Sequence, residues 1–151
     1  MDAALGDSLR FDIVDQVLLV VHADMPPSAH DWARLITVRD ANRLRIRATL
    51  VVAPPRASLS AQQRSDVVSF MKSTGGGIAV LTDSALVRGV ARALGLLGLR
   101  VRAYAPLEIA SALDFCGVTE PRREDLRRRI AALQAQLAGM TKAPAPVSLP
   151  R

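Results

Sequence analysis

The stretch that decides the fold reads Ile78-Ala-Val-Leu-Thr-Asp83-Ser84-Ala-Leu, continues through an apolar segment to Gly98 and ends Arg100-Val-Arg-Ala-Tyr104. A short apolar run, a polar helix cap, about four turns of helix and an alternating run make one strand–helix–strand unit. Two strands joined by a crossover helix pair in parallel, with the helix on one face of the sheet. The unit therefore predicts an α/β protein with a mainly parallel sheet.

Flanking segments extend this pattern towards the N-terminus. Weak alternation from Ser8 to Val14 predicts an edge strand, and the apolar runs 17–21 and 46–53 predict strands buried in the sheet. Ser28 and Ser60 are expected to cap the helices that follow these two runs, and Ser60 begins a capping-box pattern. The predicted architecture is a central mixed, mostly parallel sheet of about five strands with helices packed on it, plus an added C-terminal helix.

The C-terminal part divides into a helix and a tail. An amphipathic helix is expected over residues 120–139, after an α/β domain spanning residues 8–118. Its apolar side chains are spaced four, three and four residues apart, which is a short heptad stripe. This stripe can dock on the domain or pair with a second subunit, so a homodimer is one expectation: Leu126, Ile130, Leu133 and Leu137. The Pro- and Ala-rich tail, residues 140–151, is predicted to be disordered.

Composition narrows the class of protein. The chain has 151 residues, enough for one domain with its own core, and 50% of them are apolar. The net charge is +6, but only 3% of the residues are aromatic, which disfavours single-stranded nucleic acid as a partner because such binders stack bases on aromatic rings. Arg88 and Arg92 interrupt the longest apolar segment, so no membrane span is expected. One cysteine and the lack of a signal-peptide pattern predict a cytoplasmic protein.

No residue pattern assembles a catalytic or metal centre. The pairs His22-x-Asp24 and His30-Asp31 do not supply the three or four convergent ligands of a metal site, and the histidines are expected to be solvated loop residues. The triple glycine at 75–77 lacks the Lys-Ser/Thr of a phosphate-binding loop, and no Gly-x-Ser-x-Gly elbow is present. The sequence therefore predicts no enzyme activity, no metal and no cofactor.

The order of elements resembles the STAS fold of sulphate transporters and anti-sigma-factor antagonists. The segments that carry the resemblance are Ala48-Thr-Leu-Val-Val-Ala53, Leu59-Ser60-Ala-Gln-Gln-Arg64, Ile78 to Arg92 and Val101-Arg-Ala-Tyr104, within about residues 9–117. The resemblance implies a non-enzymatic, regulatory protein-interaction module in a bacterial signalling assembly. Its lipid-carrying relatives imply an alternative, a small-molecule or lipid-binding domain in which the helix after Ser84 lines an apolar pocket instead of covering the sheet as ordinary core.

Four residues are predicted to form an interaction or phosphorylation surface: Ser58, Ser60, Asp83 and Ser84. In the antagonists, a serine that follows aspartate at a helix start is phosphorylated by a partner kinase. The corresponding loop here reads Ala57-Ser58-Leu59-Ser60, without an Asp-Ser pair. A phosphate at a helix N-terminus gains from free backbone N–H groups, and the alternative is that each serine caps or flanks its helix.

Overall fold

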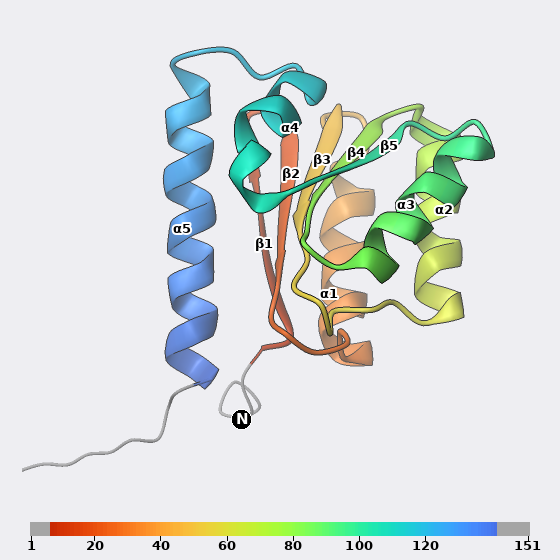
Figure 1. Ribbon diagram of the computed structural model, residues 1–151, viewed down its shortest axis with the longest axis horizontal. Coiled ribbons are helices and arrows are strands. Elements are labelled where there is room, and N and C mark those ends of the chain that lie inside the picture. Colours follow the sequence, from red (N-terminus) through yellow and green to blue (C-terminus); the bar gives the residue numbers. More distant parts are fainter. Residues whose placement is uncertain (1–6, 142–151) are drawn as a thin grey trace, which may run out of the picture.

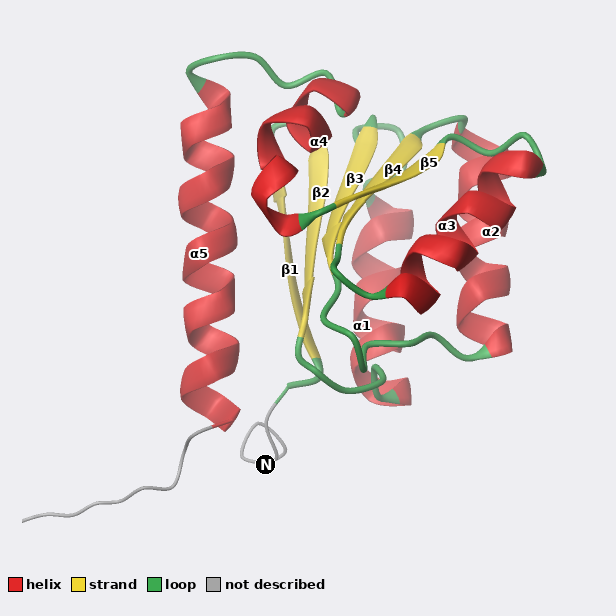
Figure 2. Ribbon diagram, in the orientation of Figure 1, coloured by secondary structure: helices red, strands yellow, loops and turns green. Residues whose placement is uncertain are grey.

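The computed structural model describes residues 7–141, in which a five-stranded sheet lies between two groups of helices (Figure 1). This confirms the predicted α/β class and the mixed, mostly parallel sheet. Figure 2 separates strands from helices along the chain. The strands are β1 Leu9–Val14, β2 Val17–His22, β3 Ala48–Val52, β4 Gly77–Leu81 and β5 Val101–Tyr104. The helices are α1 Ala29–Ala41, α2 Ala61–Thr74, α3 Ala85–Leu96, the short 3-10 turn η2 Pro106–Glu108, α4 Ile109–Phe115 and α5 Arg122–Thr141.

The strands lie in the sheet in chain order, from β1 to β5. β1 pairs antiparallel with β2 through a tight turn in which Asp15 has a φ of 56°, and the other three pairs are parallel. Right-handed crossovers that always step in the same direction place their helices on the same face of a sheet. Consequently α1, α2 and α3 share one face, and α4 and α5 cover the other.

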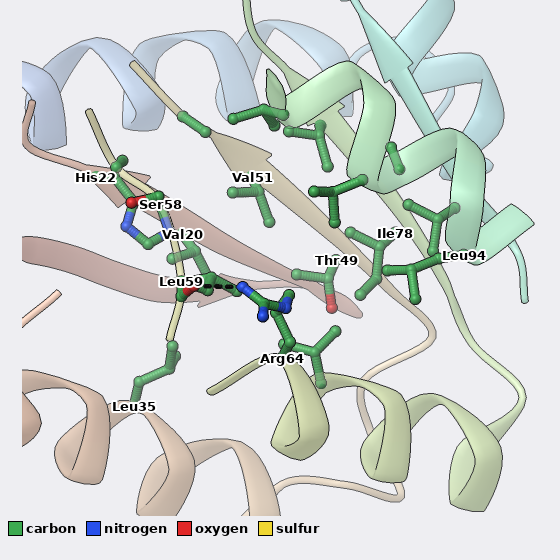
Figure 3. A pocket seen from close by; sticks show the side chains of 18 of the residues that line it. Val20, His22, Leu35, Thr49, Val51, Ser58, Leu59, Arg64, Ile78 and Leu94 are labelled. Atoms are coloured by element: carbon green, nitrogen blue, oxygen red, sulfur yellow. Dashed lines mark hydrogen bonds between the residues drawn. The ribbon is translucent and has the colours of Figure 1, made fainter. Parts of the chain in front are cut away.

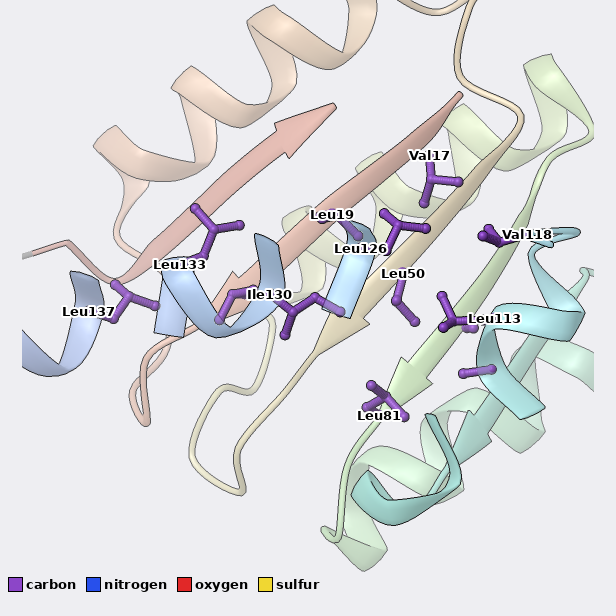
Figure 4. Packing of buried hydrophobic residues seen from close by; sticks show 13 residues of the cluster. Val17, Leu19, Leu50, Leu81, Leu113, Val118, Leu126, Ile130, Leu133 and Leu137 are labelled. Carbon is purple, nitrogen blue, oxygen red and sulfur yellow. The ribbon is translucent and has the colours of Figure 1, made fainter. Parts of the chain in front are cut away.

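The face covered by α4 and α5 is a closed apolar core (Figure 4). Leu19, Leu50 and Ala79 come from three neighbouring strands and are 0% exposed. Leu113 of α4 packs against them and is equally buried. Alternate residues of a strand point to opposite faces, so these positions leave the intervening side chains of β2, β3 and β4 for the other layer.

The apolar stripe of α5 completes this core. Its four side chains are between 1% and 5% exposed and belong to the same cluster as the central strands: Leu126, Ile130, Leu133 and Leu137. Of the two alternatives for the stripe, docking on the domain is the arrangement in the structure. The side chains predicted to mediate self-association are thus buried within their own chain. α5 ends at Thr141, so the predicted tail, apart from its first two residues, lies outside the described residues.

Serine caps set the starts of α1, α2 and α3, as the sequence predicts for Ser28 and Ser60. The side chain of Ser28 caps α1. Ser60 accepts a hydrogen bond from the backbone N of Gln63 at 3.1 Å, and the Gln63 side chain accepts one from the backbone N of Ser60 at 2.9 Å, which completes the capping box. Ser84 accepts from the backbone N of Val87 at 3.2 Å. All three helices therefore begin at the same edge of the sheet, beyond the carboxyl ends of the parallel strands.

None of the helices in residues 7–141 combines the length and the apolar composition that crossing a bilayer requires.

Candidate functional site

A cavity of about 220 Å³ lies between the sheet and the layer formed by α1, α2 and α3 (Figure 3). Protein interiors are close-packed, and voids larger than a water molecule are few in a domain. An apolar cavity of about 150 Å³ is already large enough to stay dry and bind benzene. The space under the three helices is therefore large enough for a small organic molecule, and it is the candidate functional site.

Short side chains keep this space open. On the sheet side, Ala53, Val51 and Val80 point towards the helices, and from α3 Val90 and Ala91 point back towards the sheet. Alanine and β-branched side chains extend only a short way from the backbone, so the two layers do not meet between them. The opposite face of the same sheet has Leu19, Leu50 and Ala79 at its central positions and is filled by side chains of α4 and α5. The identity of alternate strand residues thus produces a filled face and a hollow one.

The wall of the cavity is mainly apolar, and its polar side chains lie mostly at one end. His22 ends β2, and Ser58 and Arg64 follow the carboxyl end of β3, so the three lie at the carboxyl edge of the sheet. Towards the opposite edge, the wall includes Phe70 of α2 and Ile78 at the start of β4, with Thr49 beside Ile78 and Arg39 over the Phe70 ring. The end of the cavity where α2 begins therefore has three polar side chains, and the opposite end is mainly apolar but includes Thr49 and Arg39.

His22 is buried without a hydrogen-bond partner for one ring nitrogen. Its side chain lines the cavity and is 6% exposed, and its Nδ1 atom has no partner among the described residues. Burial lowers the pKa of His22 to about 4, because a charged imidazolium is poorly solvated there. At neutral pH the ring is therefore uncharged and has one donor and one acceptor nitrogen. An unpaired buried polar atom costs about 1–3 kcal/mol, which a ligand with a polar group would recover.

The expectation that His22 is a solvated loop residue is wrong. It is the last residue of β2 and follows the side-chain alternation of that strand, so it shares the cavity face with Leu18 and Val20. The sequence contained a signal for this placement. If the strand predicted over residues 17–21 is extended by one residue, position 22 faces the same side of the sheet as positions 18 and 20. His30, in contrast, is exposed in the first turn of α1, as expected.

The loop that closes the polar end is held by hydrogen bonds to its backbone. Arg64 donates from Nη1 to the carbonyl of Leu59 at 2.7 Å, and the backbone N of Arg56 donates to Oδ1 of Asp24 at 2.8 Å. Ser58 and Arg64 are exposed and also line the cavity, so they form part of its rim. The indole of Trp32, on α1, reaches the cavity wall while its Nε1 donates to Oδ2 of Asp66.

The four residues of the predicted interaction or phosphorylation surface all lie at the carboxyl edge of the sheet, but in different settings. Ser60 and Ser84 are engaged as helix caps, and Ser84 is only 8% exposed. Asp83 is exposed next to the α3 cap. Ser58 is the member of the set that lines the cavity. The structure thus connects Ser58 with the candidate site and accounts for Ser60 and Ser84 as capping residues.

Other reactive side chains do not converge on the cavity. No group of three or more His, Cys, Asp or Glu residues with the spacing of a metal site occurs in the part of the chain that the structure describes. Cys116 is half-buried, and burial raises the pKa of its thiol to about 11, which keeps it protonated at neutral pH.

Comparison of the chain with models of known protein families finds no match, and a search of the curated proteins finds none.

Proposed function

We propose that the protein binds a small, mainly apolar molecule in the cavity under α1, α2 and α3 and acts as a binding module without enzymatic activity. The observation that carries the proposal is the cavity itself, about 220 Å³ in volume and walled almost entirely by apolar side chains. Ligand sites are typically concave and apolar, with a few polar groups that orient the ligand. The polar groups that would orient a ligand here are those of His22, Ser58 and Arg64.

The wall formed by α3 supports the proposal. Ala91 is its one buried residue, and the cavity-facing Val87, Val90 and Leu94 are only half-buried. An element with few buried apolar contacts opens at lower free-energy cost than the core of the domain. Such an opening between α3 and the sheet gives a ligand a route into the cavity, and a bound ligand would bury the apolar side chains that α3 turns towards it.

The protein contains its own reporter for the test. Trp32 is the single tryptophan of the chain and lines the cavity. Titration with the fluorescent apolar probe 1-anilinonaphthalene-8-sulfonate should change Trp32 emission saturably, with one probe molecule per chain. Binding with no saturation, or with no response of Trp32, would contradict a single site in the cavity.

A matched pair of variants on α3 locates the site. Ala91→Leu places three more carbon atoms in the cavity and should weaken probe binding at least about tenfold, which corresponds to about 1.4 kcal/mol. Ala93→Leu makes the same change at an exposed position outside the cavity wall and should leave affinity unchanged. If Ala91→Leu does not fold by circular dichroism, Val90→Phe serves the same purpose. Equal affinity of the cavity variant and the Ala93→Leu control would refute the proposal.

A second candidate function is the STAS-type interaction module, which would take part in a bacterial regulatory assembly in the cytoplasm. The supporting observation is a pair of exposed leucines at the end of α3, the helix that starts beside Asp83 and Ser84. Leu96 and Leu97, the last residue of α3 and its C-cap, are 84% and 77% exposed. An affinity pull-down should recover a partner with the natural chain and lose it with the double change Leu96→Ser and Leu97→Ser. A partner recovered equally by both chains would contradict this surface.

A further inference from the structure

We infer that the ligand is a small monocarboxylate, with an apolar body in the deep part of the cavity and its carboxylate at the end formed by His22 and Arg64. This inference rests on the proposed binding function and adds the chemical class of the ligand. It rests on the unpaired ring nitrogen of His22, the positive charge around the cavity and the length and lining of its deep part.

In the described part of the chain, His22 has a ring nitrogen without a hydrogen-bond partner. His22 lines the polar end of the cavity, and its buried Nδ1 atom has no partner among residues 7–141. Because the ring is neutral at physiological pH, it can present one N–H to a ligand oxygen. A hydrogen bond to a charged acceptor is about twice as strong as one to a neutral acceptor, so a carboxylate oxygen is the favoured partner for the single N–H of this ring.

The charged side chains around the cavity are positive. The charged side chains in its wall are Arg39 and Arg64, and no carboxylate lines it among the described residues. Arg39 lies over the Phe70 ring, with 4.1 Å from the guanidinium carbon to the ring centre, and pairs with Asp40 at 3.2 Å. Arg64 donates one Nη1–H to a backbone carbonyl and has no ion-pair partner in the described part of the chain. Its remaining donors are therefore available at the cavity rim.

The N-terminus of α2 also favours an anionic group at the polar end of the cavity. α2 begins at Ala61, three residues before Arg64, and its first turn contains no acidic side chain. The positive end of the helix dipole is therefore not offset by a side chain of its own helix. With the basic net charge of the chain, +6, this favours an anionic group over a neutral or cationic one at the polar end.

The length and the lining of the deep part of the cavity indicate which apolar body the ligand has. Leu18 and His22 both line the cavity on β2, and four residues of strand at about 3.3 Å each separate them by about 13 Å. Towards the Leu18 end the wall is formed mainly by aromatic and aliphatic side chains such as Phe70, Ile78 and Leu94. Thr49 also lies at this end, and so does Arg39, whose charge is paired with Asp40. A medium-chain fatty acid or an aromatic acid of one or two rings matches this length and lining.

The experiment compares three ligands that share an apolar chain and differ in the head group: octanoate, 1-octanol and octylamine. Each is titrated against the full chain at neutral pH, with Trp32 emission and displacement of the fluorescent probe as readouts. Octanoate should bind at least about tenfold more tightly than the other two, a difference of about 1.4 kcal/mol. Equal affinities of the three ligands would overturn the inference and leave the proposed binding function intact.

Variants assign the preference to the two residues. His22→Leu and Arg64→Gln should each reduce the octanoate affinity by about fivefold or more and leave the 1-octanol affinity within about twofold. Arg92→Gln removes a cation from the exposed side of α3, outside the cavity wall, and should leave all affinities unchanged. An unaltered octanoate preference in both His22→Leu and Arg64→Gln would refute the carboxylate site. Failure of the probe and of all three ligands to bind would instead refute the proposed function.

Discussion

Acidification from about pH 7 to about pH 4.5 should lower the free energy of unfolding by about 2 kcal/mol through His22 alone. Burial lowers the pKa of this residue in the folded state from 6.5 to about 4. Between these two values the unfolded chain carries a proton on His22 and the folded chain does not. The unfolded state therefore binds more protons, and stability falls as the pH falls.

The magnitude follows from the difference between the two pKa values. One pKa unit corresponds to about 1.36 kcal/mol, so the full difference of about 2.5 amounts to about 3 kcal/mol, which is lost completely only below about pH 4. At about pH 4.5 roughly 2 kcal/mol of this has been lost relative to neutral pH. The expected unfolding free energy of a domain of this size is about 5–15 kcal/mol, so the effect is large enough to measure by denaturation.

The assay is urea unfolding followed by circular dichroism at the two pH values, on the natural chain and on His22→Leu. Leucine occupies the buried position without titrating, so the natural chain should lose about 2 kcal/mol more than the variant on acidification. Two opposite effects act on the pKa of Asp31: burial raises it, and hydrogen bonds from Ser8 lower it. The lowering is the larger effect, so the pKa lies below its ordinary value of 3.8. Ionisation of Asp31 therefore contributes little to the comparison at about pH 4.5.

Two results would refute this reasoning. The first is an equal loss of stability in the natural chain and in His22→Leu, which would place the pH dependence elsewhere. The second is a magnetic-resonance titration in which the folded protein shows His22 with a pKa near its ordinary value of 6.5. Either result would mean that the ring is hydrated in the folded state, and the donor proposed for the carboxylate site would be open to water.

Three further predictions address the packing and local chemistry. Leu133→Ala should lower the free energy of unfolding in urea by about 2–5 kcal/mol because this side chain is 2% exposed, whereas Leu107→Ala, at 97% exposure, should change it by less than about 0.5 kcal/mol. Similar effects of the two substitutions would contradict the docking of α5 on the sheet. Ser60→Ala should cost about 1 kcal/mol in the same assay through loss of the capping box, and the exposed mid-helix change Ser65→Ala is its control. A stability equal to that of the control would argue against the box. Cys116, whose thiol pKa burial raises from 9.0 to about 11, should react with iodoacetamide about 100-fold more slowly in the folded protein than in urea, and equal rates would contradict its burial.

The sequence was sufficient to predict the sheet and the helix starts because both depend on local patterns. The apolar run that became β2 and the alternating run that became β1 have the periodicity of strands, and the caps Ser28, Ser60 and Ser84 lie where the hydroxyl can meet a free backbone N–H. Arg39 was an exception. It is only 9% exposed and lies over the Phe70 ring, because a guanidinium can stack on an aromatic face that no local pattern reveals.

The cavity could not be predicted in the same way. An apolar helix face such as that of Val87, Val90 and Leu94 has the same pattern whether it meets the sheet or stops short of it. The distance between the layers depends on the sizes of side chains brought together from β3, β4 and α3, which are far apart in the sequence. His22 was the residue that the pattern could have identified, since it continues the alternation of β2.

The strand order has a consequence for how this protein can change. Every crossover lies on one face of the sheet, so the side chains that shape the cavity and those that anchor α4 and α5 alternate along the same strands and share only the backbone. Val51 can be exchanged without touching Leu50, and Val80 without touching Ala79. Variation at every second strand position can therefore change the shape of the cavity while the anchoring half of the molecule stays as it is.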